Sequence, residues 1–410
     1  MKYLFCSSVF NMKDYEHLAA HTKGPLYLAD HNLNSNLILG LEEASGSSIT
    51  LINNTPIRTF PSYPKIFFHR QSWSHGNGSR DVNCGFINLP ILKHLSRAVT
   101  TFTALRRIIK DAEKGSVCIF TYELHVGISL AVLFIKRFYP AVHTCAVLPD
   151  IPDLAVLAHT QGKDTLGGRF RAAVKTRFIR HFEMFVVLTK YMQELPVFAG
   201  KPSVIIEGIY NDTQGPLPES TSEKKIILYT GTLNPAYGIE NLINAFLQLY
   251  RFDQDYELWF CGGGSLEKRI QNLEKQCPGL RNFGYVNTDK VRECQAQATV
   301  LVNPRQNNDT LARYAFPSKT MEYLASGRPV VGYKLDGIPE EYDAYIQYVP
   351  DDSLEALRDK LKEVCELSKE QRAEIGKRSR EFILQKKNPK VMGQQILDMW
   401  KEACADADQI

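Results

Sequence analysis

The chain alternates short β-rich runs with longer segments of helical period, and it does so twice. This alternation is typical of parallel sheets with helices on both faces. In the first half we predict six strands: Tyr3–Val9, Ile49–Asn53, Val117–Tyr122, Thr144–Leu148, Phe185–Leu188 and Val204–Glu207. In the second half we predict six more: Ile226–Tyr229, Glu257–Cys261, Asn282–Val286, Val300–Asn303, Val330–Tyr333 and Ile346–Val349. The pattern therefore predicts an α/β protein with two doubly wound, Rossmann-like domains.

A polar stretch with Pro and Gly separates the two repeats and continues neither pattern. We therefore expect an N-terminal domain at 1–210, a linker at 211–222 and a C-terminal domain at 223–385. Residues 386–410 are predicted to form a helix that can pack back on the N-terminal domain. Because ligands bind at the carboxyl ends of parallel strands, the two domains should face each other across a cleft that holds the site.

The charge differs between the two halves, although the net charge is only +4. Residues 1–213 hold 23 basic and 16 acidic residues, a balance of +7, whereas residues 214–410 hold 26 and 29, a balance of −3. This asymmetry favours an anionic partner for the first half, either a membrane surface or a phosphate-bearing acceptor. The alternative is surface charge without a partner.

The nine cysteines are scattered singly, without the spacing of a zinc site or the density of a disulfide scaffold. We expect them to be reduced residues of a cytoplasmic protein. The most apolar stretch, 128–135, is far shorter than the roughly 20 residues that cross a bilayer. The first residues also lack the long apolar core of a secretory signal. We therefore expect no transmembrane segment, and at most peripheral attachment to the inner face of a membrane.

The run Arg169–Arg180 contains five cations and no acidic residue, and Phe170, Val174 and Phe178 recur at every fourth position. This spacing predicts a basic amphipathic helix, which can lie on anionic lipid headgroups. The alternative is a helix that packs on the core through its apolar side and leaves its cations in solvent. Nucleic acid is a poorer partner, because no aromatic-rich binding module accompanies the charge.

The most informative segment, 314–331, has Pro-Ser at 317–318, a helical run, and Ser-Gly before a β-branched strand. It predicts a short helix whose N-terminus points into the cleft. Free backbone N–H groups and the helix dipole favour an anion there, and Lys319 adds a full charge against a diphosphate. Glu322 lies about one turn further on, where its carboxylate can accept hydrogen bonds from ribose hydroxyls. The alternative is a capped helix with an exposed lysine.

Together with segments 229–239 and 283–286, this block resembles the donor domain of family 4 retaining glycosyltransferases of the GT-B fold. The first half resembles the same family at 148–153, 188–192 and 206–209, so the resemblance covers nearly the whole chain. It implies a metal-independent enzyme that transfers a sugar, with retention, from a nucleotide-sugar such as a UDP- or GDP-sugar. The implied acceptor is a glycan or a lipid-linked saccharide in polysaccharide or cell-envelope synthesis.

The chain departs from the family's pattern at two positions. Members have a first glutamate, which contacts the transferred sugar, where this chain has Tyr314, so that contact should differ here. Glu322 matches the second glutamate, which contacts the ribose. Members also commonly carry a cation where this chain has Thr232.

We predict that nine residues surround the nucleotide-sugar: Gly231, Thr232, Tyr285, Tyr314, Phe316, Pro317, Ser318, Lys319 and Glu322. Lys319 and Arg305 should neutralise the departing nucleoside diphosphate, so that no metal is needed. Arg305 could otherwise be an ordinary surface arginine.

On the acceptor side, His125 and Asp150 each follow a predicted strand and should therefore stand at the cleft edge. We expect both to position the acceptor; the alternatives are a helix-capping histidine and a turn-capping aspartate. The Asp-x-Asp sequences at 253–255 and 406–408 lack the strand-end context of a metal site. The glycines at 262–264 are more typical of a tight turn than of a dinucleotide fingerprint.

A second hypothesis is a catalytically degenerate GT-B protein that binds glycan and assists a partner glycosyltransferase. Tyr314 and Thr232 favour it, whereas Lys319 and Glu322 oppose it. A sugar-nucleotide epimerase on a similar fold would need further titratable residues in the cleft, and the sequence does not identify them.

Overall fold

The computed structural model describes residues 2–23, 26, 28–76, 78–110, 117–150, 166–307 and 312–407. The chain forms two compact units. Unit 1 contains Met1–Ile209 and Pro389–Ile410, and unit 2 contains Tyr210–Asn388. Unit 2 is thus inserted, in the order of the chain, before the last helix of unit 1.

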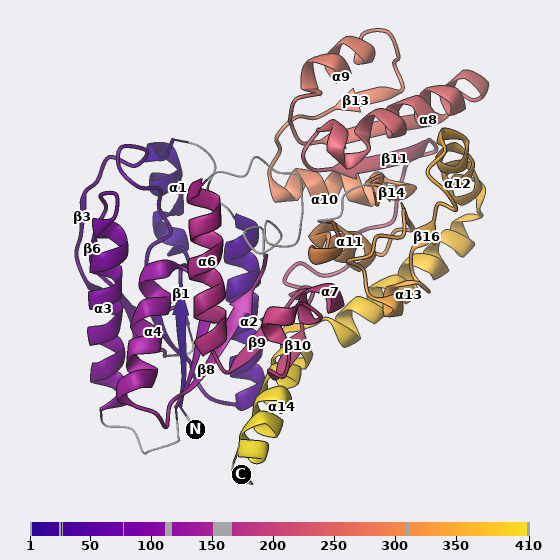
Figure 1. The fold of residues 1–410 in the computed structure, drawn as a ribbon. Coiled ribbons are helices and arrows are strands. Elements are labelled where there is room, and N and C mark those ends of the chain that lie inside the picture. The colour runs from indigo at the N-terminus through magenta and orange to yellow at the C-terminus, as the bar shows by residue number, and fades with distance from the viewer. Residues whose placement is uncertain are drawn as a thin grey trace. The chain divides into compact units, whose positions relative to one another are not determined.

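Unit 1 is built on an eight-stranded sheet with the order β10-β9-β8-β7-β1-β2-β5-β4 (Figure 1). All described neighbours in it are parallel except β4 and β5, which are antiparallel. The strands are β1 (Lys2–Ser7), β2 (Thr50–Asn53), β4 (Gln71–Trp73), β5 (Asp81–Asn83), β7 (Val117–Tyr122), β8 (His143–Leu148), β9 (Met184–Val187) and β10 (Ser203–Ile205). A small antiparallel sheet joins β3 (Phe67–Phe68) to β6 (Phe86–Ile87).

Helices cover this sheet on both faces (Figure 1). One face carries α3 (Leu92–Ile109), α4 (Val126–Phe138) and α6 (Leu166–His181); the other carries α2 (Leu28–Ser45) and α14 (Pro389–Ala407). Shorter helices complete the unit: α1 (Met12–His21), α7 (Lys190–Gln193) and the 3-10 turn η1 (Pro196–Phe198).

The last helix, α14, packs tightly on α2 through two glycines. A Cβ atom at Gly40 would lie 2.3 Å from the carbonyl oxygen of Pro389, and one at Gly393 would lie 2.0 Å from that of Gly40. Buried side chains from both helices, such as Leu37 and Ile396, belong to one apolar cluster with β1, β7 and β8. The core of unit 1 therefore includes the C-terminal helix.

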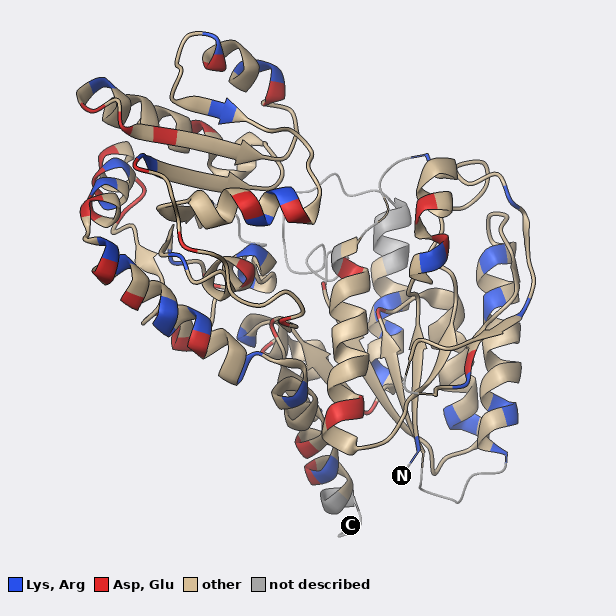
Figure 2. Cartoon of the chain, turned by 180° about the vertical axis from the view of Figure 1, so that it is seen from behind, with Lys and Arg blue, Asp and Glu red and all other residues tan. Residues whose placement is uncertain are grey.

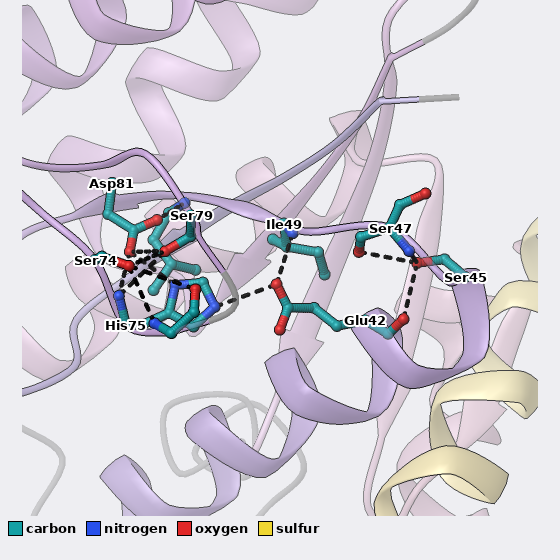
Figure 3. A network of polar contacts seen from close by, with 10 residues as sticks. Glu42, Ser45, Ser47, Ile49, Ser74, His75, Ser79 and Asp81 are labelled. Carbon is teal, nitrogen blue, oxygen red and sulfur yellow. Dashed lines mark hydrogen bonds and ion pairs between the residues drawn. The ribbon is translucent and has the colours of Figure 1, made fainter.

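A buried polar network holds α2 to the loop between β4 and β5 (Figure 3). His75 Nδ1 lies 2.7 Å from Asp81 Oδ2, and His75 Nε2 lies 3.3 Å from Glu42 Oε1. The Ser79 hydroxyl donates to Asp81 at 2.8 Å. Asp81 and Glu42 also accept backbone N–H bonds from the neighbourhood of β2, so the imidazole bridges two anchored carboxylates.

Unit 2 is built on a six-stranded parallel sheet with the order β13-β12-β11-β14-β15-β16 (Figure 1). The strands are β11 (Lys225–Thr230), β12 (Tyr256–Cys261), β13 (Leu280–Asn282), β14 (Val300–Asn303), β15 (Val330–Gly332) and β16 (Gln347–Tyr348). The helices are α8 (Ile239–Phe252), α9 (Glu267–Glu274), α10 (Thr288–Gln297), α11 (Ser318–Ala325), α12 (Leu354–Glu366) and α13 (Lys369–Lys386).

The predicted α/β fold with two Rossmann-like sheets is confirmed. One predicted strand is misplaced: residues 283–286 follow β13 as a loop, because Gly284 has φ +67° and breaks the extended conformation. The basic run Arg169–Arg180 lies in α6 as predicted, with Phe178 only 7% exposed and Arg177 and Arg180 on the surface. Among the described helices, none combines the length and apolarity that a membrane crossing requires.

Candidate functional site

A short helix of unit 2, α11, carries the two charged residues of the predicted donor motif. Its Tyr323 attaches the helix to the end of β11. The Thr230 N–H donates to the Tyr323 hydroxyl at 2.8 Å, and that hydroxyl donates to the Thr230 carbonyl at 3.2 Å. Asn303 of β14 donates to the Thr320 hydroxyl at 3.3 Å. These bonds hold α11 against the carboxyl ends of β11 and β14.

The Lys319 side chain lies directly on the backbone of Gly231, the residue that follows β11. A Cβ atom at position 231 would lie 1.5 Å from Lys319 Nζ and 2.5 Å from Lys319 Cε. Gly231 also has φ +140°, a conformation that other residues rarely adopt. Only glycine therefore allows the ammonium group to occupy this place.

Within the described ranges, no acceptor or carboxylate contacts the Lys319 ammonium group. Its Nζ lies 5.1 Å from the centre of the Tyr229 ring. Burial lowers the pKa of Lys319, and the nearby Glu322 opposes that shift. A half-buried cation without an acceptor is electrostatically unsatisfied, so this position favours an anionic ligand.

The N-terminus of α11 adds backbone donors beside this lysine. The helix starts after Pro317, and no side chain caps its first turn. Ser318 is exposed, and the first N–H groups of a helix have no partner within it. Together with the helix dipole, these donors suit a phosphate group.

Glu322 lies one turn beyond Lys319 on the same side of α11. Partial loss of hydration raises the pKa of its carboxyl group, and Lys319 opposes that shift. The residue is exposed, so its carboxyl oxygens are accessible to a ligand. It can therefore accept hydrogen bonds from hydroxyl groups of a ligand.

Loops of unit 2 approach one another closely at further glycines. A Cβ atom at Gly262 would lie 1.9 Å from the Gly231 carbonyl oxygen, and one at Gly238 would lie 1.9 Å from the Pro304 carbonyl oxygen. The glycines at 262–264 thus form a tight turn between β12 and α9, as the sequence indicated. This packing brings together the loops after β11, β12 and β14.

Arg305 follows Pro304, so it belongs to the loop after β14 that packs against the loop after β11. Its guanidinium carbon lies 5.7 Å from the centre of the Tyr237 ring, which belongs to the loop after β11. Arg305 also lowers the pKa of the Tyr229 hydroxyl against the larger, opposite effect of burial. The structure thus places Lys319 beside Tyr229 and Arg305 beside Tyr237, both at the segment formed by the end of β11 and the loop that follows it.

Three of the remaining predicted residues are accessible. Thr232 and Tyr285 are exposed, and Tyr314 is half-buried in the 3-10 turn η3 (Ala312–Tyr314). The Tyr285 ring is 83% exposed and lies against Gly263, where a Cβ atom would be 2.3 Å from its Cε2. An aromatic face is therefore presented beside the glycine turn.

Phe316 differs from the expectation. Its side chain is only 8% exposed and packs in the core against Tyr342, with ring centres 5.4 Å apart. It anchors the segment that precedes α11, so only its backbone can contact a ligand. Its position beside Pro317 in the motif gave no indication of this burial.

His125 and Asp150 follow β7 and β8 at the carboxyl edge of the sheet in unit 1. His125 occupies the N-cap position of α4, but its side chain makes no capping bond; instead, its Nε2 lies 3.1 Å from Glu123 Oε2. Burial and the cations Arg97 and Lys175 lower its pKa, so we regard the imidazole as neutral at pH 7. Asp150 is exposed.

Two buried cations at the same edge escaped prediction. Lys93 and Arg97 of α3 are 6% and 7% exposed. Lys93 Nζ donates to the Ile57 carbonyl at 2.6 Å, and Arg97 Nη2 donates to the Thr55 carbonyl at 2.7 Å. In the part of the chain that the structure describes, neither has a carboxylate partner. Burial and the charge of Arg97 lower the pKa of Lys93 to about 7.

Several further polar atoms at this edge are buried without a hydrogen-bond partner in the described chain. They lie near the ends of β1, β2 and β7: Ser7 Oγ, Ser8 Oγ, Asn54 Oδ1, Thr121 Oγ1 and Tyr122 Oη. Buried polar atoms are normally paired, so this edge is suited to a polar ligand.

Sequence signals for the missed residues exist in retrospect. Lys93, Arg97, Thr101 and Leu105 recur at every fourth position, which places them on one face of α3. Tyr323 stands four residues after Lys319, on the side of α11 that faces β11. In both cases the charged or polar residue type suggested an exposed side chain, whereas the periodicity indicated the buried face of the helix.

The carboxylates of the Asp-x-Asp sequence at 253–255 are used in ion pairs. Asp253 lies 2.8 Å from the Lys225 ammonium group, and Asp255 lies 2.5 Å from that of Lys224. The sequence at 406–408 extends beyond the described residues.

Comparison with solved structures shows what this arrangement resembles. Sucrose-phosphate synthase from Thermosynechococcus elongatus matches with a TM-score of 0.65 and 15% identity, over 99% of this chain and 100% of that chain. The catalytic domain of starch synthase IV from Arabidopsis thaliana, bound to ADP and acarbose, matches with a TM-score of 0.64 and 9% identity, over 99% of both chains. Anabaena Alr3699/HepE in complex with UDP matches with a TM-score of 0.59 and 13% identity, over 98% and 100%.

Sequence comparison is narrower. No curated protein sequence matches the chain. Residues 216–382, which include Gly231, Arg305 and α11, match the family described as "Glycosyl transferases group 1". The chain therefore has the GT-B fold, and residues 216–382 of its second unit are similar to glycosyl transferases group 1.

Proposed function

We propose that this chain is a glycosyltransferase that holds a nucleotide-sugar in unit 2 and transfers the sugar, with retention, to a glycan or lipid-linked saccharide. The supporting observation is the Lys319 ammonium group at the start of α11, which lies on Gly231 and has no acceptor among the residues that the structure describes. The segment matched to glycosyl transferases group 1 contains both residues. Structural neighbours solved with UDP or ADP agree with a nucleotide ligand.

The diphosphate of the donor would lie at the N-terminus of α11, with Lys319 and Arg305 as counter-charges. Negative charge on the leaving diphosphate grows as its oxygen separates from the anomeric carbon. The cations then stabilise the transition state more than the bound donor, and no metal is required. The departing phosphate oxygen can take the proton of the acceptor hydroxyl that forms the new glycosidic bond.

The rest of the donor is assigned to the residues around this charge. Glu322 would accept hydrogen bonds from the ribose, and the exposed Tyr285 face beside Gly263 would contact the base. Tyr314 stands in place of the family's first glutamate, so the transferred sugar would meet a phenol rather than a carboxylate. We assign the synthesis of polysaccharide or cell envelope as the pathway on the resemblance of the motifs.

The acceptor is assigned to the carboxyl edge of the sheet in unit 1. Lys93 and Arg97 there are buried and have no carboxylate partner within the described ranges, and His125 and Asp150 follow neighbouring strands. Such an edge suits an acceptor that carries phosphate, as a lipid-linked saccharide does. The exposed cations of α6, Arg177 and Arg180, would add electrostatic attachment to an anionic membrane on its cytoplasmic face.

Calorimetric titration with UDP and GDP, in buffer with a metal chelator, tests the nucleotide site. We expect heat with one of the two nucleotides, and at least about tenfold weaker binding for Lys319→Ala because a desolvated counter-charge is lost. Lys377→Ala, an exposed lysine of α13, is the control and should bind as the unchanged protein does. Equal affinity of Lys319→Ala and the control would contradict the assignment.

The second candidate is a catalytically degenerate protein that binds glycan and assists a partner enzyme. Exposed Thr232 and half-buried Tyr314, at positions where the family carries charged residues, favour it. Incubation with a panel of nucleotide-sugars separates the two candidates. A transferase should hydrolyse or transfer from one donor, whereas a glycan-binding partner should neither turn over nor bind any nucleotide.

A further inference from the structure

Unit 1 contains a cavity of about 410 Å³ between α3 and the small β3–β6 sheet, and neither His125 nor Asp150 lines it. Val82, Phe86 and Ala104 line it and are buried. Phe67 and Ile87 stand at its rim, with Phe67 61% exposed. The size and the apolar lining are those of a ligand site rather than of a packing defect.

A strip of exposed apolar side chains runs along α3 beside this cavity. Leu92, Leu95 and Val99 are 44%, 54% and 63% exposed. The next face of the same helix lines the cavity through Ser96, Thr100 and Thr103. The strip therefore borders the cavity.

The strip continues onto α4. Phe102 of α3 contacts Phe138 of α4, with ring centres 6.1 Å apart, and Phe138 and Phe134 are 66% and 54% exposed. In unit 2, by contrast, the large exposed apolar side chains among the described residues are Tyr237, Phe252 and Tyr285, which belong to separate elements. Apolar surface gathered on adjacent helices marks an interaction site.

The charged residues of α3, α4 and the cavity rim indicate which kind of partner can bind this surface. α3 and α4 contain no acidic residue, and Figure 2 shows where Lys and Arg lie along the chain. The exposed cations of these two helices include Arg106, Arg107 and Arg137. Arg70 lies at the cavity, and Lys65 Nζ lies 5.1 Å from the centre of the Phe68 ring at its rim. Because the acidic residues are missing from α3 and α4 themselves, the apolar strip on these two helices is complementary to an anionic amphiphile.

We propose that this cavity receives one hydrocarbon chain of an anionic membrane lipid. Leu92, Leu95 and Val99 then enter the lipid interface, and the surrounding cations contact the headgroups. A partner protein fits less well, because its surface would have to supply apolar and anionic groups together, whereas an anionic bilayer presents both. The inference does not depend on glycosyl transfer. It also differs from attachment through α6, which would be electrostatic alone.

Cosedimentation with phosphatidylcholine vesicles, with and without phosphatidylglycerol, at low and high salt tests the inference. We expect binding to the anionic vesicles that persists in part at high salt, because a buried chain is not screened. Val99→Asp should weaken this binding at least about tenfold. Thr103→Trp, which fills the cavity from an accessible position, should remove the part that survives high salt. Phe252→Asp, at an 89% exposed apolar position in unit 2, is the control and should change neither.

Three results would overturn the inference. The first is binding that high salt abolishes entirely, which would leave only electrostatic attachment. The second is binding that Val99→Asp and Thr103→Trp leave unchanged. The third is a dimer that Val99→Asp dissociates, without vesicle binding, since the strip would then contact a second copy of the chain. Thermal unfolding and nucleotide titration of each variant show that the fold and the donor site are retained, so failure here leaves the proposed function unaffected.

Discussion

The sheets of the two units place positively charged side chains at their carboxyl edges by different means. In unit 2, backbone packing at Gly231, Gly238 and Gly262 brings loops together and leaves the half-buried Lys319 without an acceptor among the described residues. In unit 1, Lys93 and Arg97 are buried in the flank of a long helix, where backbone carbonyls satisfy them in part. The edge in unit 2 depends on glycines, which have no side chain, whereas the edge in unit 1 depends on two long side chains that are buried.

Gly231→Ala is expected to have the largest effect, because it disturbs the loop packing in unit 2. The new Cβ would overlap the Lys319 ammonium group, and φ +140° would add backbone strain. We expect nucleotide affinity to fall about a hundredfold, because the ammonium group must leave its place. Gly215→Ala is the matched control, since Gly215 has φ +70° and open space around its Cα. If both variants bind nucleotide alike, Gly231 does not position the lysine.

Lys93→Met tests the role of the buried cations in unit 1. It removes the ammonium group and keeps most of the length of the side chain, but the Ile57 carbonyl loses its donor, so we expect stability to fall by about 1 to 2 kcal/mol. The specificity constant for an anionic acceptor should fall about tenfold while nucleotide affinity stays the same. A loss of nucleotide binding would show that the two edges are not separate in function.

Tyr323→Phe tests whether the attachment of α11 to the end of β11 matters for catalysis. The variant keeps the ring in the core but loses the hydrogen bonds to Thr230. We expect kcat to fall about threefold to tenfold with little change in melting temperature, because Lys319 becomes less firmly placed. Met321→Leu, a buried change on the same helix, should leave kcat unaltered. A variant that loses stability but not turnover would make Tyr323 purely structural.

His75→Gln removes the imidazole between Asp81 and Glu42, and it has the smallest effect. The hydrogen bond and the charges of these carboxylates raise the pKa of His75 above 6.5, although burial opposes them. A raised pKa stabilises the folded state below the ordinary value and loses that stabilisation as pH rises through the folded value. The variant should therefore be less stable by about 1 kcal/mol at mildly acidic pH, with a smaller difference at alkaline pH. Thermal unfolding at both pH values measures this, and a difference that grows with pH would refute it.

Much of the fold could be read from the sequence because each long strand has its own apolar run. The strands around Val117–Tyr122 and Glu257–Cys261 lie almost where the pattern placed them. The strands β3 to β6 could not be found, because strands of two or three residues contain no measurable alternation.

The candidate site was partly predictable for a related reason. The start of α11 and the place of Lys319 follow from local signals, namely Pro-Ser before a helical run. The burial of Phe316, Lys93 and Arg97 depends on residues far away in the chain, which no local pattern contains. Contacts between distant loops, such as Gly238 with Pro304, were invisible for the same reason.

The return of α14 to unit 1 affects how the protein is made. Ile396 and Trp400 belong to the apolar cluster formed by β1, β7 and α2, yet they are synthesised after all of unit 2. On the ribosome, unit 2 can complete its core while unit 1 still exposes the surface that Gly40 and Gly393 will bring together. A nascent chain should therefore depend on chaperones mainly through its first half, until the final helix emerges from the exit tunnel.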